Sequence, residues 1–169
     1  MSADRWLDAY AGQTTDELIA LEDEYRADSI VIAFEQALMT KAVCDGVAGL
    51  TAEERVVLAV EAVEREVNNG GFEQLFTDAS KALAPYFGES LQAIGAGEAE
   101  RLTREAIDAL RIEGPLTVEA IDRAMDRESE ERDEALADCD DRYYDVAGDL
   151  AAPLFAYIKA NRAQITLEA

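Results

Sequence analysis

The sequence predicts an all-α protein, a single compact domain of about eight or nine helices over residues 1–169. Apolar residues recur at spacings of three and four along most of the chain, which is the period of a helix with one buried face. No stretch alternates between apolar and polar residues for long enough to form a strand. Apolar residues make up 49% of the chain, so it can bury a core in spite of its charge.

The first 49 residues are predicted to form acidic helices. Residues 5–11 read as a short amphipathic helix, and Thr14 to Glu17 has the spacing of a capping box that opens a second one. A third predicted helix covers residues 28–45 and ends at Gly46. Its predicted inward positions are Val31, Phe34, Leu38 and Val43.

Residues 50–163 are predicted to be helical as well. A second capping box, Thr51 to Glu54, opens a long helix, and Pro85 and Gly88 are predicted to break the chain after it. Further helices are predicted over residues 98–110 and from Thr117 onward, separated by a turn at Gly114-Pro115. Pro153 lies in the first turn of the last helix, and residues 164–169 are predicted to fray.

The segment from Glu66 to Phe76, E-V-N-N-G-G-F-E-Q-L-F, is where residue identity matters most. A helix with one valine-rich face meets Asn68-Asn69-Gly70-Gly71, and a new apolar set follows at once. Asn and Gly adopt positive φ at low cost, so we predict a tight corner between two helices. Its side chains are expected to satisfy free backbone groups rather than to bind a ligand. The residues of this structural signature are Glu66, Asn68, Asn69, Gly70, Gly71, Phe72 and Gln74.

This segment resembles the signature E-V-N-N-G-G-F-x-Q-F-F of the bacterial DNA-mimic protein family. The resemblance extends over residues 50–163 and includes Asp141-Arg142-Tyr143-Tyr144 and Tyr157-Ile158. The chain departs from the family at Thr77-Asp78-Ala79-Ser80, where an Asn-Ser-Ser-Gly-like turn is usual. The resemblance implies a protein that imitates DNA toward a DNA-binding protein.

The sequence lacks most of the residues and motifs that are typical of enzyme active sites. Histidine, the commonest general base and metal ligand, is absent, and no phosphate-binding or nucleophile motif is present. Glu61, Glu64 and Glu73 could supply carboxylates, but bundle metal sites also need Glu-x-x-His pairs. The sequence therefore predicts a non-enzyme without metal or cofactor. Cys44 and Cys139 belong to no C-x-x-C pair and are predicted to be reduced thiols of a cytoplasmic protein, with no membrane span or secretory leader.

Charge is the second informative feature. The chain carries 37 acidic and 15 basic residues, a net charge of −22. A globule of this length has a diameter of roughly 40 Å. Duplex DNA carries one charge per about 1.7 Å, or roughly 24 charges over that length. The totals match, and a phosphate-like surface would repel nucleic acid itself, so we predict no direct nucleic-acid binding.

Residues 119–149 hold 13 acids against four arginines, a net charge of −9. As one helix they would span about 46 Å, and a break near Ser129 is the alternative. Rows such as Asp122-Asp126-Glu130-Glu134-Asp138 repeat every four residues, although like charges at that spacing destabilise a helix. The predicted phosphate-mimicking carboxylates are Glu119, Asp122, Asp126, Glu130, Glu131, Asp133, Glu134, Asp138 and Asp141. A secondary acidic surface is predicted at Asp16, Glu17, Glu22, Asp23, Glu24 and Asp28.

These observations favour a monomer or homodimer that sequesters a basic DNA-binding protein, such as a helix-turn-helix transcriptional regulator. Two alternatives use the same charge. One is an immunity-type inhibitor of a basic enzyme such as a nuclease. The other is an acidic structural domain of a salt-adapted organism, kept soluble by its charge.

Overall fold

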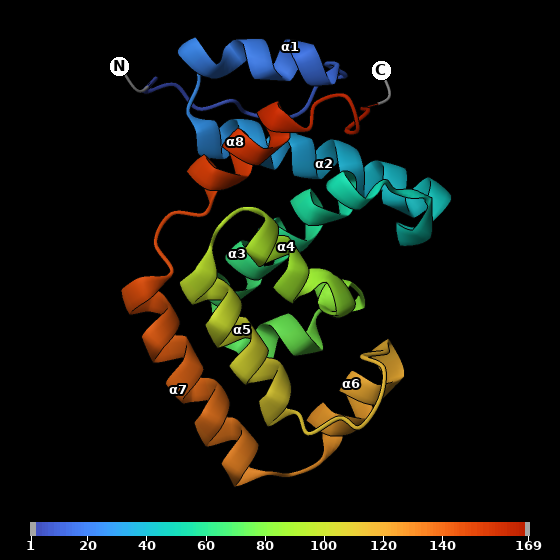
Figure 1. Cartoon of the computed structure of the whole chain (residues 1–169), viewed down its shortest axis with the longest axis vertical. Helices are drawn as coiled ribbons and strands as arrows, with labels where there is room; N and C mark the ends of the chain where they lie inside the picture. Colours follow the sequence, from blue (N-terminus) through green and yellow to red (C-terminus); the bar gives the residue numbers. More distant parts are fainter. Residues whose placement is uncertain (1–2, 168–169) are drawn as a thin grey trace. The chain divides into compact units, whose positions relative to one another are not determined.

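The computed structural model (Figure 1) describes residues 3–167 and confirms the all-α class. Of these described residues, 73% are helical. Its residues divide into two compact units. The terminal unit comprises residues 1–61 and 149–169, and the central unit comprises residues 62–148.

The terminal unit contains the ends of the described chain. Its elements are α1 (Thr15–Ile19), the 3-10 turn η1 (Ala20–Asp23), α2 (Ala27–Asp45), η2 (Val47–Gly49), the first turns of α3 (Ala52–Thr77), and α8 (Ala151–Ala160). α8 lies alongside α2 (Figure 1). The core between these elements includes Ile30, Phe34, Leu38, Leu154 and Ile158, each fully buried.

Both predicted capping boxes of this unit are present. The Thr14 hydroxyl accepts from the Glu17 amide, while the Glu17 carboxylate accepts from the Thr14 amide at 2.8 Å. Thr51 and Glu54 exchange the same pair of hydrogen bonds, both 3.0 Å, at the start of α3. The last residue of α2 is Asp45, and Gly46 ends the helix as predicted, with a positive φ of 75° that favours glycine.

Three predictions for this unit are wrong. Residues 5–11 are extended: Arg5 forms a bridge with Tyr25, and the Leu7 and Tyr10 amides donate to Ser29 and Gln36 of α2. Side chains of α2 supply hydrogen-bond partners to these amides, which therefore do not need the backbone bonds of a helix. Val43 is not inward but 85% exposed.

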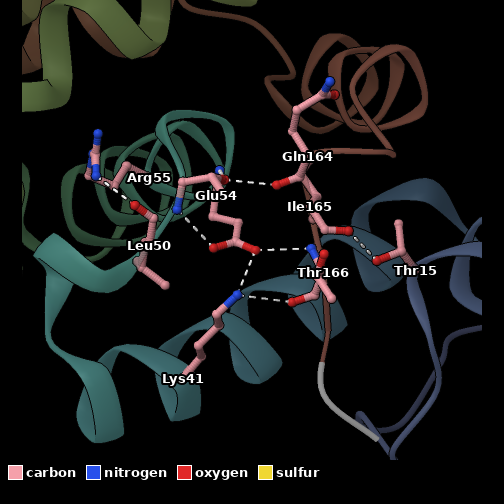
Figure 2. Close-up of polar contacts among 9 residues, drawn as sticks. Thr15, Lys41, Leu50, Glu54, Arg55, Gln164, Ile165 and Thr166 are labelled. Carbon is pink, nitrogen blue, oxygen red and sulfur yellow. Dashed lines mark hydrogen bonds and ion pairs between the residues drawn. The ribbon is translucent and has the colours of Figure 1, made fainter.

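The C-terminal segment is the third correction, because residues 164–167 are anchored rather than frayed (Figure 2). Ile165 and Leu167 are buried, and the Ile165 carbonyl accepts from Thr15 at 2.6 Å. The Thr166 amide donates to Glu54 at 2.9 Å. Residues 168 and 169 of that prediction lie outside the described residues.

Glu54 is the centre of this anchoring. Its carboxylate is fully buried and accepts from Lys41 Nζ at 2.8 Å, and Lys41 also donates to the Thr166 carbonyl (Figure 2). Burial alone would raise the pKa of Glu54, but hydrogen bonds from Lys41, Thr166 and Thr51 hold it below its ordinary value. The network therefore ties α2, the start of α3 and the C-terminal segment together.

The central unit contains the rest of α3 and the remaining helices. These are η3 (Ala79–Tyr86), α4 (Phe87–Ala93), α5 (Gly97–Ala109), α6 (Val118–Asp126) and α7 (Glu130–Val146). α7 packs along α5, and α5 along α4 (Figure 1). Gly88 does not break the chain as predicted but lies inside α4, where its missing side chain makes room for Arg104. The core contains Phe72, whose ring meets Tyr143 of α7 edge to face at 5.7 Å.

Candidate partner-binding surface

The acidic region forms two helices rather than one. α6 ends at Asp126, and Ser129 caps α7 by accepting from the Arg132 amide at 3.2 Å. The half-buried Arg132 holds the break in place, since its guanidinium donates to the carbonyls of Ala124, Met125 and Arg127 at the end of α6. The predicted five-residue row is therefore divided, with Asp122 and Asp126 on α6 and the other three members on α7.

α7 buries one face and exposes the other. Leu136, Cys139 and Tyr143 recur at spacings of three and four and are buried. On the opposite side, four exposed carboxylates follow one another at spacings of four, seven and four residues, a spacing that keeps them on one face. We call this set the outer face of α7: Glu130, Glu134, Asp141 and Asp145. It extends over about 22 Å at 1.5 Å per residue.

The nine predicted carboxylates differ in how they are paired. Four form ion pairs within the central unit: Asp122 with Lys81 at 2.6 Å, Glu131 with Arg111, Asp133 with Arg132 at 2.7 Å, and Asp138 with Arg142 at 2.9 Å. Asp122 is also the one member that is half-buried rather than exposed. Within residues 62–148, the members without an ion pair are Glu119, Asp126, Glu130, Glu134 and Asp141.

Asp145 is not among the predicted site residues, although its spacing from Asp141 indicates that it lies on the same helix face. It lies four residues after Asp141 and continues the outer face to the end of α7. A strict four-residue repeat that starts at Asp122 does not include Asp145, whereas a helix also returns to the same face after seven residues, as from Glu134 to Asp141. Asp145 also lacks an ion pair within the central unit.

The secondary acidic surface of the terminal unit is largely neutralised by its own chain. Asp16 lies 3.8 Å from Arg162, Glu22 2.6 Å from Lys159, Glu24 3.9 Å from Arg5, and Asp28 2.6 Å from Arg26. Glu17 is engaged in the capping box with Thr14, and these hydrogen bonds lower its pKa. Within the described residues, Glu17 and Asp23 of this group have no ion pair, and of these two only Asp23 is outside the capping box.

The signature segment forms the predicted corner, which α7 helps to hold. Gly71 adopts φ 75°, whereas Gly70 is non-helical at φ −156° and ψ 19°. The Phe72 amide, freed where the helix is interrupted, donates to Asp140 of α7 at 2.7 Å. The Tyr144 hydroxyl donates to the Val67 carbonyl at 2.7 Å on the other side of the corner.

The expected roles of Glu66 and Gln74 are wrong. They bind each other at 2.7 Å instead of capping backbone amides, and Glu66 also accepts from Ser80 at 3.0 Å. Glu66 is buried, so Ser80 supplies a hydrogen-bond partner that its carboxylate needs. Asn68 donates to the Glu64 carbonyl at 2.7 Å, and Asn69 is exposed.

Burial raises the pKa of Asp140, while the hydrogen bond from Phe72 opposes the shift. This carboxylate therefore belongs to the corner and not to the exposed face. Glu61, Glu64 and Glu73 do not come together: within residues 3–167, no group of three or more His, Cys, Asp or Glu side chains is arranged to hold a metal ion. Cys44 is exposed and Cys139 buried, and both are free thiols.

The fold and this surface define an all-helical acidic protein in which the signature corner holds a helix, α7, with an exposed row of carboxylates. The model of the DMP19-like protein family matches residues 48–161. The chain belongs to this family, which is a family of non-enzymatic DNA-mimic proteins. No curated protein and no solved structure shows significant similarity to the chain. Among the described residues, no helix combines the length and the apolar character needed to span a membrane.

Proposed function

We propose that the protein mimics DNA by presenting the outer face of α7 to a basic DNA-binding protein, such as a helix-turn-helix transcriptional regulator, and sequesters it from DNA. The observation that carries the proposal is that the carboxylates of this face are exposed and unpaired within their own unit. Membership of a DNA-mimic family supports it independently.

The charge density of α7 suits this role. The helix holds eight acidic residues and two arginines in 17 residues. At 1.5 Å per residue it spans about 25 Å, so one acid occurs roughly every 3 Å, against 3.4 Å per phosphate along one DNA strand. Lysines and arginines that grip a phosphate backbone would therefore meet carboxylates at a comparable frequency.

The difference in pairing explains why α7 is favoured over the secondary surface. A partner's arginine that approaches Glu22 or Asp28 must displace a lysine or arginine already there, so the net gain is small. On the outer face of α7 the same arginine forms a new ion pair and also relieves repulsion between neighbouring carboxylates. The secondary surface is the next one to test if α7 fails.

The experiment compares two variants that lose the same number of charges. The outer-face variant combines Glu130→Gln, Glu134→Gln, Asp141→Asn and Asp145→Asn. The control variant combines Asp16→Asn, Glu22→Gln, Glu24→Gln and Asp28→Asn. Each is four units less negative than −22, so net charge alone cannot separate them. All three proteins are immobilised, exposed to lysate of the source organism at low salt, and eluted with rising salt.

We expect the wild type and the control to retain a DNA-binding protein that duplex DNA displaces. The outer-face variant should bind it several kcal/mol more weakly, at about 1 kcal/mol per contact. Binding should weaken with salt, but less steeply than DNA binding, because a protein has no comparable layer of condensed counterions to release. Equal retention by the outer-face variant, or a stable complex of protein, partner and DNA together, would refute mimicry through this face.

A further inference from the structure

The central unit contains a pocket that is lined mainly by positively charged side chains, although the unit as a whole is acidic. It has a volume of about 290 Å³ and lies between the segment that follows α5 and the outer side of α6. Three arginines line it, Arg111, Arg123 and Arg127, together with one carboxylate, Glu113. Ala120, Ala124 and Ile112 add apolar surface.

Two of these arginines differ from the other basic residues of the unit. Residues 62–148 contain nine lysines and arginines, and seven form ion pairs with carboxylates of the same unit. Arg123 and Arg127 form none, although the unit holds 22 acidic residues. Both are exposed. Arg123 lies on α6, Arg127 is the capping residue directly after the last helical residue Asp126, and both line the same pocket.

Binding to the carbonyl groups at helix ends does not explain why Arg123 and Arg127 have no carboxylate partner. Cations stabilise helix C-termini, and both arginines lie near the end of α6. However, Arg132 already binds the last carbonyls of that helix. Arg127 reaches the Leu110 carbonyl at the end of α5 only at 3.5 Å, a long and weak hydrogen bond. Both guanidinium groups thus keep donors available.

The backbone at Arg111 gives a second indication. Arg111 has φ 50° and is the non-glycine residue with positive φ among the described residues. Glycine or asparagine is the usual choice at such a position after a helix. Arginine is held there although the conformation costs it energy, and strained residues of this kind cluster at ligand sites. Its ion pair with Glu131 is exposed on both sides, so it costs little to exchange for a ligand.

We propose that this pocket binds a small phosphate-type oxyanion, either free or as a phosphomonoester. Guanidinium groups bind phosphate through paired N–H donors, and two unpaired arginines that line one pocket can share one oxyanion. The pocket is larger than a phosphate ion, and its alanine and isoleucine surface suits an apolar group esterified to the phosphate. This site is independent of the proposed binding of a DNA-binding protein.

The test titrates the full-length protein with inorganic phosphate, phenyl phosphate and, separately, sodium chloride at matched ionic strength. The arginine Nε–Hε resonances are followed by NMR. We expect saturable shifts of Arg123 and Arg127 with both phosphates, tighter binding of phenyl phosphate, and no saturation with chloride. A short DNA duplex should give no saturable shift, because the surrounding carboxylates repel a polyanion.

Arg123→Gln and Arg127→Gln should each weaken phosphate binding by about tenfold to a hundredfold, the range expected for hydrogen bonds to a charged group. Arg101→Gln is the matched control, since it removes one charge from α5 outside the pocket. Because Arg123 is exposed and without an ion pair, its variant should keep the wild-type amide spectrum. Shifts that chloride reproduces, or that persist in both pocket variants, would overturn the proposal.

Discussion

Gly71 shows how one residue fixes the signature corner. At φ 75° its backbone favours glycine, and a Cβ there would lie 2.3 Å from Asp140 Oδ2. We expect Gly71→Ala to destabilise the protein by roughly 1–3 kcal/mol from backbone strain, with a further loss from the clash. Gly70→Ala should cost less, because Gly70 has negative φ and its Cβ would meet the movable Gln74 side chain. Urea unfolding of both variants measures the difference.

The double variant Gly71→Ala with Asp140→Ala separates the two causes. Truncating Asp140 removes the clash but leaves the strain, so the effect of Gly71→Ala should be smaller in that background and still unfavourable. If Gly70→Ala were the more destabilising substitution, the corner would depend on Gln74 rather than on the left-handed conformation of Gly71.

Glu54 makes the stability of the terminal unit depend on pH. Its pKa in the folded protein is lowered, so it contributes its full stabilisation above the pKa of the unfolded chain, near 4.5. That contribution is lost as the pH falls through the lower folded pKa. Glu54→Gln leaves Lys41 without its partner and should cost roughly 3 kcal/mol at pH 7.

The difference between wild type and Glu54→Gln should therefore shrink at low pH, as measured by urea unfolding across the range. Glu53→Gln is the control: the neighbouring carboxyl lies in the same turn of α3 but makes no such network. A difference that stays constant down to about pH 2, below the ordinary carboxyl pKa, would show that shape and not ionisation explains the effect.

At the scale of elements, α7 packs against the rest of the central unit through its buried face, which includes Cys139. The reactivity of the Cys139 thiol therefore measures how readily α7 detaches. Burial raises the pKa of its thiol to about 11, whereas Cys44 is exposed. Because the thiolate is the reactive form, a thiol reagent at neutral pH should label Cys44 rapidly and Cys139 only when α7 detaches. Mass spectrometry of the labelled peptides measures the two rates.

Asp140→Ala removes the hydrogen bond between α7 and the Phe72 amide, so it should accelerate labelling of Cys139 without changing Cys44. Equal acceleration at both cysteines would indicate global unfolding instead. Labelling of Cys139 in the wild type as fast as that of Cys44 would contradict the buried position of this face.

The sequence predicts an element best where its ends depend on residues close by in the chain. The capping boxes at Thr14 and Thr51 and the cap at Thr117 are local, so the starts of the helices that they open were predicted. The start of α7 after Ser129 was predicted only as the alternative of a break in one long helix. Residues 5–11 and 164–167 adopt structures fixed by side chains distant in sequence, such as Ser29, Gln36 and Glu54. Periodicity within a short window carries no information about such partners.

For the candidate surface, the sequence predicted where the carboxylates lie but not which of them form ion pairs. Composition and spacing located the carboxylates, because exposure is the ordinary state of an acidic side chain opposite an apolar stripe. Which of them are neutralised depends on Lys81, Arg111, Arg132 and Arg142. Arg132 and Arg142 pair with residues close to them in sequence, but the pairs of Lys81 with Asp122 and of Arg111 with Glu131 form only in the folded chain. The arginine-lined pocket could not be predicted for the same reason. Arg111 follows α5 and Arg123 belongs to α6, and the two line one pocket only in the folded chain.

At the scale of the whole molecule, a net charge of −22 opposes folding by self-repulsion, which salt screens. The free energy of unfolding should therefore rise between about 0.01 M and about 1 M salt, where the Debye length falls from about 30 Å to about 3 Å. An acidic domain adapted to brine would give the same rise. The two four-charge variants distinguish that alternative from a dedicated acidic face, because only one of them removes unpaired charges.

The outer-face variant should be more stable than the wild type at low salt by roughly 1 kcal/mol, at a few tenths for each like-charge pair relieved, and should gain less from added salt. The control variant breaks the ion pairs with Arg162, Lys159, Arg5 and Arg26, so it should gain no stability at low salt. Urea unfolding at several salt concentrations measures both. If the two variants were stabilised equally, repulsion would follow net charge alone, and α7 would be no more than one part of an evenly acidic surface. A gain confined to the outer-face variant would mean that this helix keeps its charges at a cost to stability, which a basic partner is expected to offset by binding.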